Sequence, residues 1–502
     1  MEVFLQAAWE GWVLVFSWPN ILYPVAGTLL AMFFSAMPGL SGVTLMALAI
    51  PFTFSWDLLH VMLIFGAFVG GATFMGSVTA ILFNIPGKNS SVAVLLDGYP
   101  MTRSGEARTA LGCSAAASAL GSTVGILVLI FLLPVLRRIL LVFGPPELLM
   151  LAVWGLTALA VLTRGSVVKG LICAGIGLLL ASIGYDPRTA EARFTFGSQY
   201  LQDGLSLVPI FLGIFALAEV VRLGVSGRTT LSGLHSQDQL SGSLARGVGA
   251  VFKNFGLFLR SSFIGTVVGM IPGIGGTVAS FIAYGHAVNS SPGEKIPFGK
   301  GNVRGVLAPE AAVDAKDGGA LLPALGLGIP GGSGTALLLA ALTVHGVSPG
   351  RAMLGDHLSL VFVLIWSLFL SNWLTSLLGL AVVNPLARLT TVRLQLLMPV
   401  ILVLATLGAY SYRGDIRDVF AAYAFGGAGY LMRKFDWPRI PLVMGIVLGP
   451  LFEANLHLTV KLHSLGRIHF WSRPVVVVLI VLSLAGIVLP VLQTLLSRKG
   501  GG

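Results

Sequence analysis

Long apolar stretches separated by short polar segments recur along the whole chain. The clearest of them are Leu120–Leu136, Leu205–Val221, Leu358–Val383 and Val475–Leu496. A helix needs about 20 apolar residues to cross the hydrocarbon core of a bilayer, and on that basis we count about eleven to thirteen crossings. The pattern therefore predicts an all-α polytopic membrane protein.

Four apolar stretches are interrupted by a Pro-Gly pair, and the interruptions form two matching pairs. Met37–Thr44 (MPGLSGVT) returns as Ile271–Thr277 (IPGIGGT), and Ile85–Gly87 (IPG) returns as Ile329–Gly331. A broken helix at membrane depth frees backbone N–H and C=O groups, which protein, water or a ligand must then satisfy. Paired breaks in the two halves of a chain are typical of the substrate site of a secondary transporter.

Further matches in the same order extend this duplication. Leu148–Met150 matches Leu396–Met398, and the dipeptide Arg164-Gly165 matches Arg413-Gly414. The matches predict two copies of one membrane unit joined by a polar segment. The predicted division is a first repeat at 12–223, a linker at 224–255, a second repeat at 256–455, and a C-terminal transmembrane helix and tail at 456–502.

Composition and charge agree with a membrane location. The chain is 55% hydrophobic and 10% charged, whereas soluble proteins carry roughly 25% charged residues. The net charge of +11 suits cytoplasmic loops that face anionic lipid, and it does not indicate nucleic acid. Basic residues gather between Arg222 and Arg260, whereas none precedes Lys88. We therefore expect a cytoplasmic linker, an external N-terminus and inverted repeats.

The Pro-Gly breaks offer groups suited to a small anion and a cation. Helix N-termini attract carboxylates, free carbonyls suit Na⁺, and nearby hydroxyls cap the new helix or face a ligand. One such break is more often a kink, but four in matching pairs favour a site. The predicted substrate- and ion-binding residues are Pro38, Gly39, Ser41, Gly42, Thr44, Asn84, Pro86, Gly87, Lys88, Asn89, Ser90, Ser91, Pro272, Gly273, Gly275, Gly276, Thr277, Pro330, Gly331, Gly332, Ser333 and Thr335.

Charged residues near these breaks are few. Lys88 brings a positive charge to its break, and we expect it to contact an anionic substrate; the alternatives are that it reaches a surface or pairs with Asp97. Acids near the ends of apolar segments are predicted to be solvated or helix-capping rather than proton carriers. These acids are Asp57, Glu219, Glu310 and Asp314.

Other patterns indicate packing or exclude chemistry. Gly66–Gly70 and Gly121–Gly125 have the small-residue spacing of closely packed membrane helices. Gly87-Lys88 lacks the remainder of a P-loop, the eight histidines are scattered, and no zinc-protease or nucleophile-elbow motif occurs. Cys113 and Cys173 lack metal-ligand spacing. We therefore predict no enzyme, no catalytic residue, no metal site and no cofactor.

The motifs together resemble the large membrane subunit of the bacterial tripartite tricarboxylate transporters, over most of the chain. The strings LDGYPM at Leu96–Met101 and APEAA at Ala308–Ala312 are the most specific. The others are Pro38–Gly42, Asn84–Gly87, Gly105–Ala107, Gly269–Thr277, Ala283-Tyr284, Gly318–Pro323 and Gly328–Gly331.

This resemblance implies a permease subunit in the bacterial inner membrane, driven by Na⁺ or H⁺ and not by ATP. Its implied partners are a small membrane subunit of about four helices and a periplasmic solute-binding protein that delivers a di- or tricarboxylate or a related organic acid. Some positions depart from the family pattern: Lys88 replaces a small polar residue, Val313-Asp314 lies where two asparagines are usual, Arg351 replaces Pro, and Ser35 replaces Gly.

Two other functions are compatible with a polytopic membrane protein. An ion channel or pore would show charged rings or repeated filter loops, usually around an oligomeric axis. A scaffold that only docks the binding protein would not need four helix breaks at membrane depth. The paired breaks within one chain favour the carrier.

Overall fold

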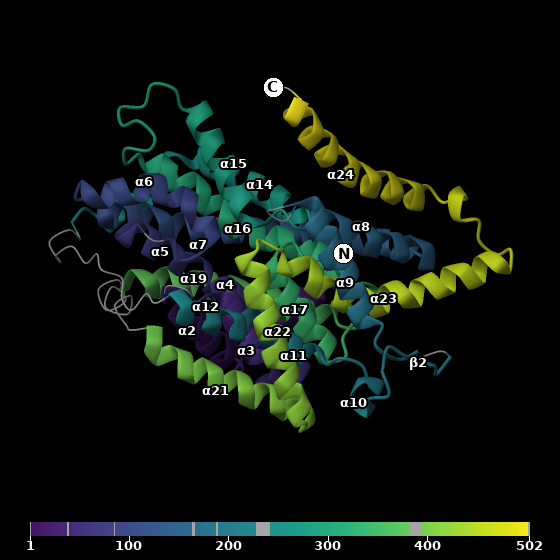
Figure 1. Cartoon of the computed structure of the whole chain (residues 1–502). Helices are drawn as coiled ribbons and strands as arrows, with labels where there is room; N and C mark the ends of the chain where they lie inside the picture. The colour runs from purple at the N-terminus through teal and green to yellow at the C-terminus, as the bar shows by residue number, and fades with distance from the viewer. Residues whose placement is uncertain are drawn as a thin grey trace.

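The computed structural model describes residues 2–37, 40–84, 86–162, 166–186, 189–226, 241–381 and 394–499. This part of the chain is helical apart from one short antiparallel ribbon (Figure 1). The elements of the first half are α1 (Glu2–Phe16), α2 (Leu22–Ala36), α3 (Gly42–Thr53), α4 (Leu58–Gly71), α5 (Thr73–Phe83), η1 (Asn89–Ser91), α6 (Val92–Arg103), α7 (Ala107–Val142), α8 (Pro145–Leu162), α9 (Val167–Ala181), β1 (Gly184–Tyr185), β2 (Ala192–Arg193), α10 (Gln199–Gln202), α11 (Leu207–Phe211), η2 (Leu212–Leu217) and α12 (Ala218–Ser226).

The second half continues with helices of similar length. Its elements are α13 (Leu244–Lys253), α14 (Phe255–Met270), α15 (Gly275–Ser290), α16 (Val303–Leu327), α17 (Ser333–Val344), α18 (Arg351–Leu354), α19 (Leu358–Ala381), α21 (Leu394–Arg413), α22 (Ile416–Lys434), α23 (Arg439–Ser464), η4 (Phe470–Ser472) and α24 (Pro474–Lys499).

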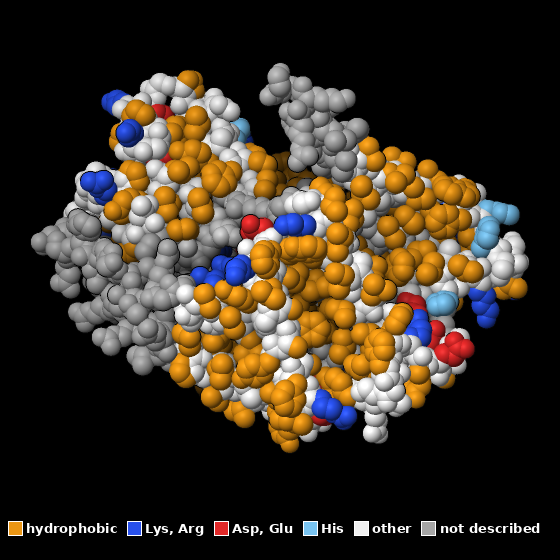
Figure 2. Space-filling model, viewed as in Figure 1, with side chains coloured by type: hydrophobic (Ala, Val, Ile, Leu, Met, Phe, Trp, Pro, Cys, Tyr) orange, Lys and Arg blue, Asp and Glu red, His pale blue; other side chains and the backbone are white. Residues whose placement is uncertain are grey.

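The helices and their surface identify an integral membrane protein. Within the described part of the chain, five helical stretches are long and apolar enough to cross a bilayer. Figure 2 shows hydrophobic side chains over much of the visible face, with charged side chains confined to a few places. The predicted all-helical membrane class is confirmed, whereas the number of crossings and the orientation of the halves stay predictions. The five stretches are Leu58–Phe83, Ala107–Leu140, Leu207–Val225, Leu358–Ala381 and Arg439–Ser464.

The first pair of breaks ends its helices in extended backbone. Met37 follows α2 with φ −85° and ψ 122°, and Ile271 follows α14 with φ −88° and ψ 115°. Both residues precede a proline, which disfavours helical backbone at the residue before it. Pro38 and Gly39 lie outside the described residues. The two members of this pair therefore terminate their helices by the same means.

The second pair of breaks ends its helices in left-handed backbone. Asn84 caps α5 with φ 58°, and Gly328 caps α16 with φ 71°. The N–H of each residue donates to a carbonyl four residues earlier, on Ala80 and Ala324 respectively. Such caps satisfy carbonyls that the end of a helix leaves free. This local likeness agrees with the predicted duplication, which as a whole stays a prediction.

Helix α16 lies between α7 and α14, with backbone close to backbone. A Cβ atom on Gly125 of α7 would stand 2.2 Å from the carbonyl oxygen of Ala315, and one on Gly269 of α14 would stand 2.3 Å from that of Lys316. A Cβ on Gly121 would likewise stand 2.6 Å from the carbonyl oxygen of Ala311. The glycine spacing at Gly121–Gly125 therefore has the packing role predicted for it.

The predicted domain boundaries fall within ordered elements. Helix α13 occupies the end of the predicted linker and packs on α7, where a Cβ on Gly247 would meet the Thr109 carbonyl oxygen at 2.1 Å. Residues 227–240 of that linker lie outside the described residues. Helix α23 crosses the predicted boundary between 455 and 456. Beyond it, α24 is fastened to α8 by Arg473, which donates to Glu147 at 2.7 and 2.8 Å.

Candidate functional site

The break between α5 and α6 folds back onto α5. The N–H of Gly87 donates to the carbonyl of Gly76 at 3.1 Å, and a Cβ on Gly87 would lie 2.6 Å from the Gly76 Cα. The side chain of Lys88 crosses the same glycine, because a Cβ on Gly76 would meet the Lys88 Cγ at 3.0 Å. Because Gly76 and Gly87 have no side chains where they meet, the side chain of Lys88 can lie flat against α5 and extend toward α16.

Lys88 faces the charged residues of α16. The half-buried ammonium lies within electrostatic range of Glu310, Asp314, Lys316 and Asp317. Of these, Lys316 forms an ion pair with Asp317, which also accepts a hydrogen bond from the Thr73 hydroxyl at 3.3 Å. The predicted alternative in which Lys88 pairs with Asp97 is wrong, because the Asp97 carboxylate is occupied by other donors.

The break between α14 and α15 lies next to the Lys88 break. A Cβ on Gly276 would stand 3.2 Å from the Ser90 Cβ and 3.5 Å from the Lys316 Cε. Gly273 and Gly275 have φ of 82° and 72°, a backbone conformation that favours glycine. The chain can therefore turn sharply here and begin α15 beside the other break.

The break between α16 and α17 lies against α16 and the end of α14. A Cβ on Gly331 would lie 2.7 Å from the Ala320 Cβ and 3.0 Å from the Gly269 carbonyl oxygen. The Thr335 hydroxyl accepts the Gly332 N–H at 3.0 Å, which satisfies one free donor at the start of α17. The three breaks thus meet around the middle and the end of α16.

Open space borders two of these breaks. A Cβ on Gly275, Gly332 or Gly334 would meet no other atom within 4 Å, whereas the glycines between α7, α14 and α16 are in close contact. Both breaks begin a helix of eight or more residues, and helix N-termini favour negative charge. The arrangement can hold a small anion between helix N-termini and an ammonium group.

The first break reaches this centre only indirectly. A Cβ on Gly42 would meet the Ala72 Cβ at 2.6 Å, and the next residue, Thr73, binds Asp317. The Ser41 hydroxyl caps α3 by accepting the Thr44 N–H at 3.3 Å, and the two hydroxyls lie 3.2 Å apart. The capping alternative for Ser41 is therefore confirmed. Its substrate-binding role, like that of the other predicted residues, stays a prediction.

The predicted substrate- and ion-binding residues differ in their exposure at the protein surface. Ser90, Ser91, Pro272, Pro330, Gly331 and Thr335 are buried; Gly87, Lys88, Gly273, Gly275, Gly276, Thr277, Gly332 and Ser333 are half-buried; Asn84, Pro86 and Asn89 are exposed. The half-buried residues lie where the breaks border open space.

The acids of α16 were missed as components of this centre. Glu310 is 1% exposed and Asp314 is 0% exposed, so the prediction that they are solvated or capping residues is wrong. They lie four residues apart on one face of a helix that runs without interruption from Val303 to Leu327. That i, i+4 spacing is the signal in the sequence that could have identified them.

Of the other two acids, Asp57 is exposed as predicted, whereas Glu219 is buried. Asp57 has a side chain that is 88% exposed, as predicted. Glu219 is only 7% exposed and forms ion pairs with Arg222 and Arg433, so its predicted solvation is wrong. Burial is possible there because two guanidinium groups neutralise the carboxylate.

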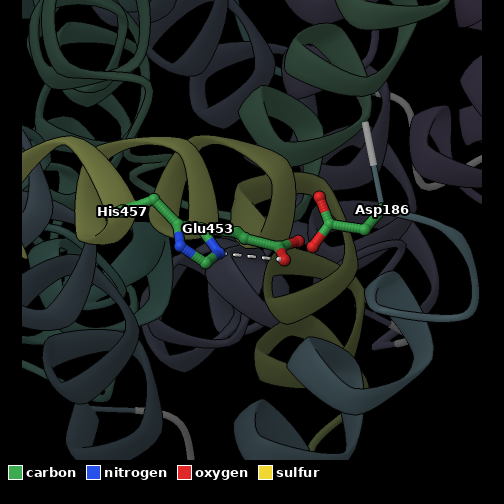
Figure 3. Close-up of side chains that lie close together, drawn as sticks. All are labelled: Asp186, Glu453 and His457. Carbon is green, nitrogen blue, oxygen red and sulfur yellow. Dashed lines mark ion pairs between the residues drawn. The ribbon is translucent and has the colours of Figure 1, made fainter. Parts of the chain in front are cut away.

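A separate group of side chains has the composition of a metal site. Oxygen and nitrogen atoms of Asp186, Glu453 and His457 lie within 4.8 Å of one another (Figure 3). The guanidinium of Arg193 forms ion pairs with both carboxylates, and so it supplies the positive charge that a metal ion would bring. We interpret the group as a link between the β1–β2 ribbon and α23.

Comparisons with known proteins agree with the geometry. The family model described as "Tripartite tricarboxylate transporter TctA family" matches residues 21–444. The chain is similar to an uncharacterized 52.8 kDa protein in the TAR-I ttuC' 3' region of Agrobacterium vitis, with 32% identity over 96% of this chain and 95% of the relative. A second Agrobacterium vitis protein, in the TAR-II ttuC' 3' region, is 31% identical over 47% of this chain and 97% of its own length. No solved structure matches the chain significantly.

Proposed function

The chain belongs to the tripartite tricarboxylate transporter TctA family, and we propose that it carries a di- or tricarboxylate, or a related organic acid, across the bacterial inner membrane. It acts as the permease subunit of the three-part system, driven by a Na⁺ or H⁺ gradient. A periplasmic solute-binding protein delivers the acid, and a small membrane subunit accompanies the permease. Members of this family are transporters, not enzymes.

One observation carries the substrate class. Lys88 lies in a broken helix, beside the break at Gly276 and above α16. An ammonium group, free backbone donors and open space at Gly275 and Gly332 together suit a small carboxylate. The Lys88 ammonium interacts with the carboxylates of α16 only at longer range and forms no direct ion pair among the described residues, so it can still accept a substrate carboxylate as a direct partner.

A pore is the competing function. The glycine contacts that close α16 against α7 and α14 favour a carrier, because they leave no continuous path between those helices. The charged residues of the centre come from the α5–α6 break and from α16 of one chain, and not from a symmetric ring.

The test is uptake of labelled carboxylates into proteoliposomes that contain this subunit and its small partner. The binding protein is added outside, and Na⁺ and pH gradients are imposed separately. We expect saturable uptake of one acid, dependent on the binding protein and on one gradient. Leak of many solutes, independent of both, would instead establish a pore.

A further inference from the structure

Three serines of α7 form a row of unsatisfied hydroxyl groups. Ser114, Ser118 and Ser122 lie four residues apart, and so they share one face of the helix. They are 0%, 0% and 1% exposed, and their hydroxyl oxygens have no hydrogen-bond partner among the described residues. Thr123, on a neighbouring face, makes the usual bond to the carbonyl four residues earlier, at 2.8 Å. The serines are therefore placed for something other than their own helix.

The serine row faces the two buried acids of α16. Ser114 lies beside Glu310 and Ser118 lies beside Asp314. The hydroxyl and carboxylate oxygens of each pair are close enough to interact, but they do not meet the distance and angle of a full hydrogen bond. Among the described residues, both Asp314 oxygens and the Glu310 Oε2 have no such bond. Each unsatisfied buried polar group costs roughly 1–3 kcal/mol. A cluster of hydroxyl and carboxylate oxygens with free lone pairs is the donor set that hard cations prefer.

The charge of the centre also requires a cation. When all five groups are ionised, three carboxylates (Glu310, Asp314 and Asp317) stand against two ammonium groups (Lys88 and Lys316), and a bound cation or a proton must balance one negative charge. Lys316 is taken up by Asp317. Lys88 is close enough to interact with Asp314 electrostatically, but it forms no direct ion pair with a described carboxylate. The uncompensated charge therefore falls on Glu310 and Asp314.

We propose that Asp314, together with Glu310, Ser114 and Ser118, binds the monovalent cation that drives uptake. Asp314 and Lys88 both depart from the usual family residues, so the charged ligand that Asp314 supplies is a feature of this chain's own site. The inference rests on the proposed transport function and assigns the coupling site within it. The cation is Na⁺, held by the carboxylate and hydroxyl oxygens, or a proton, held by a carboxyl group that then donates to a serine.

The same geometry explains how cation and substrate are coupled. A substrate carboxylate that binds Lys88 neutralises the positive charge that faces Asp314. The affinity of Asp314 for a cation then rises, and by linkage a bound cation raises the affinity of the Lys88 break for the substrate. Lys88 thus connects an anion site in the breaks with a cation site between α7 and α16.

The first experiment measures cation binding directly. Equilibrium binding of radiolabelled Na⁺ to the purified protein is compared with binding to Asp314→Asn and Ser118→Ala. The control is Ser483→Ala, which removes a buried hydroxyl that has its own bond to Leu479 at 2.7 Å. We expect Asp314→Asn to weaken Na⁺ binding by about tenfold or more, as loss of a charged partner in a buried site does.

The second experiment separates Na⁺ from protons. Uptake into the proteoliposomes described above is driven by a Na⁺ gradient at equal pH, or by a pH gradient in Na⁺-free choline buffer. Whichever gradient drives the wild-type protein, we expect Asp314→Asn to lose that stimulation and Ser118→Ala to need a larger gradient. Ser483→Ala should respond as the wild type does.

Two results would overturn the assignment. One is an Asp314→Asn protein that elutes as the wild type on size exclusion and keeps full gradient stimulation. The other is Ser118→Ala with unchanged cation dependence, which decides the matter even if the Asp314 variant fails to fold. Absence of binding-protein-dependent uptake in the wild type would instead contradict the transport function, and the Na⁺-binding measurement would still test the site.

Discussion

The carboxylate of Asp97 accepts the backbone N–H of Gly301 at 2.9 Å, across more than 200 residues of sequence. The same Oδ1 atom accepts the N–H groups of Gly299 and Asn302 at 2.9 and 2.8 Å, and Oδ2 accepts the Tyr284 hydroxyl at 2.9 Å. One acid of α6 thereby fixes the loop that leads into α16. The position of the buried acids on α16 depends on this contact, although Asp97 touches neither of them.

Replacement of Asp97 by alanine should therefore loosen the start of α16. Hydrogen bonds to a charged group contribute about 1.5–3 kcal/mol each, so we expect Asp97→Ala to lower the melting temperature of the purified protein markedly. Tyr284→Phe, which removes only one donor, is the matched control and should have a small effect. Equal melting temperatures for the two variants would contradict the role of the backbone contacts.

Addition of one methyl group between α7 and α16 should destabilise the protein. A Cβ on Gly125 would stand 2.2 Å from the Ala315 carbonyl oxygen, whereas one on Gly175 of α9 would meet nothing within 4 Å. Overpacking of this kind costs about 1–3 kcal/mol. We expect thermal unfolding of Gly125→Ala at a lower temperature and of Gly175→Ala at an unchanged or slightly higher one. A Gly125→Ala protein as stable as the wild type would show that α16 can move away.

Neutralisation of Lys88 should weaken the binding of the substrate. In Lys88→Gln the ammonium that faces the breaks is lost, and we expect KM for uptake to rise about tenfold, as for loss of a hydrogen bond to a charged group. Lys88→Arg should retain part of the affinity. Lys295→Gln, at an exposed position, is the control. Unchanged uptake kinetics in Lys88→Gln would remove Lys88 from the substrate site.

The attachment of α24 should depend on one ion pair. Glu147 is 4% exposed, and it accepts from Arg473 and also from the Gly144 N–H at 2.8 Å. Removal of one partner of a buried pair costs about 3–5 kcal/mol because the other charge stays buried. Arg473→Gln should therefore speed hydrogen exchange of the α24 amides while the α16 amides keep their protection. Faster exchange throughout the chain would indicate global rather than local unfolding.

The positions of the helix breaks could be predicted from local backbone signals. The long-range contacts between the breaks could not be predicted from the sequence. Pro38, Asn84, Pro272 and Gly328 mark helix ends through intrinsic backbone preferences that need no tertiary information. Which break lies beside which depends on contacts such as Gly276 with Ser90, nearly 190 residues apart. The sequence therefore predicts which residues form each break. It does not predict that three of the breaks meet around α16 while the first lies apart from them.

The buried acids illustrate the opposite limit. Charged residues are rarely fully buried, so the sequence predicts that Glu310 and Asp314 are solvated or helix-capping. Lys88, from a distant break, lies within electrostatic range of both acids and lowers the cost of placing them away from water, although it forms no direct ion pair with either. A helix wheel of 303–327 would have put both acids on one face, but it would not have identified the serine row of α7 as the opposite wall.

The close contacts of α16 also determine which parts of the protein can move. Carbonyl oxygens of α16 lie against Gly125 on one side and Gly269 on the other, and packing this close leaves no room for sliding. An alternating-access cycle of the proposed carrier would therefore displace α7, α14 and α16 as one rigid body, with the acids and the serine row inside it. The compliant sides are the open ones, at Gly275, Gly332 and Gly334. Hinges should accordingly be sought in the breaks and not between the three central helices.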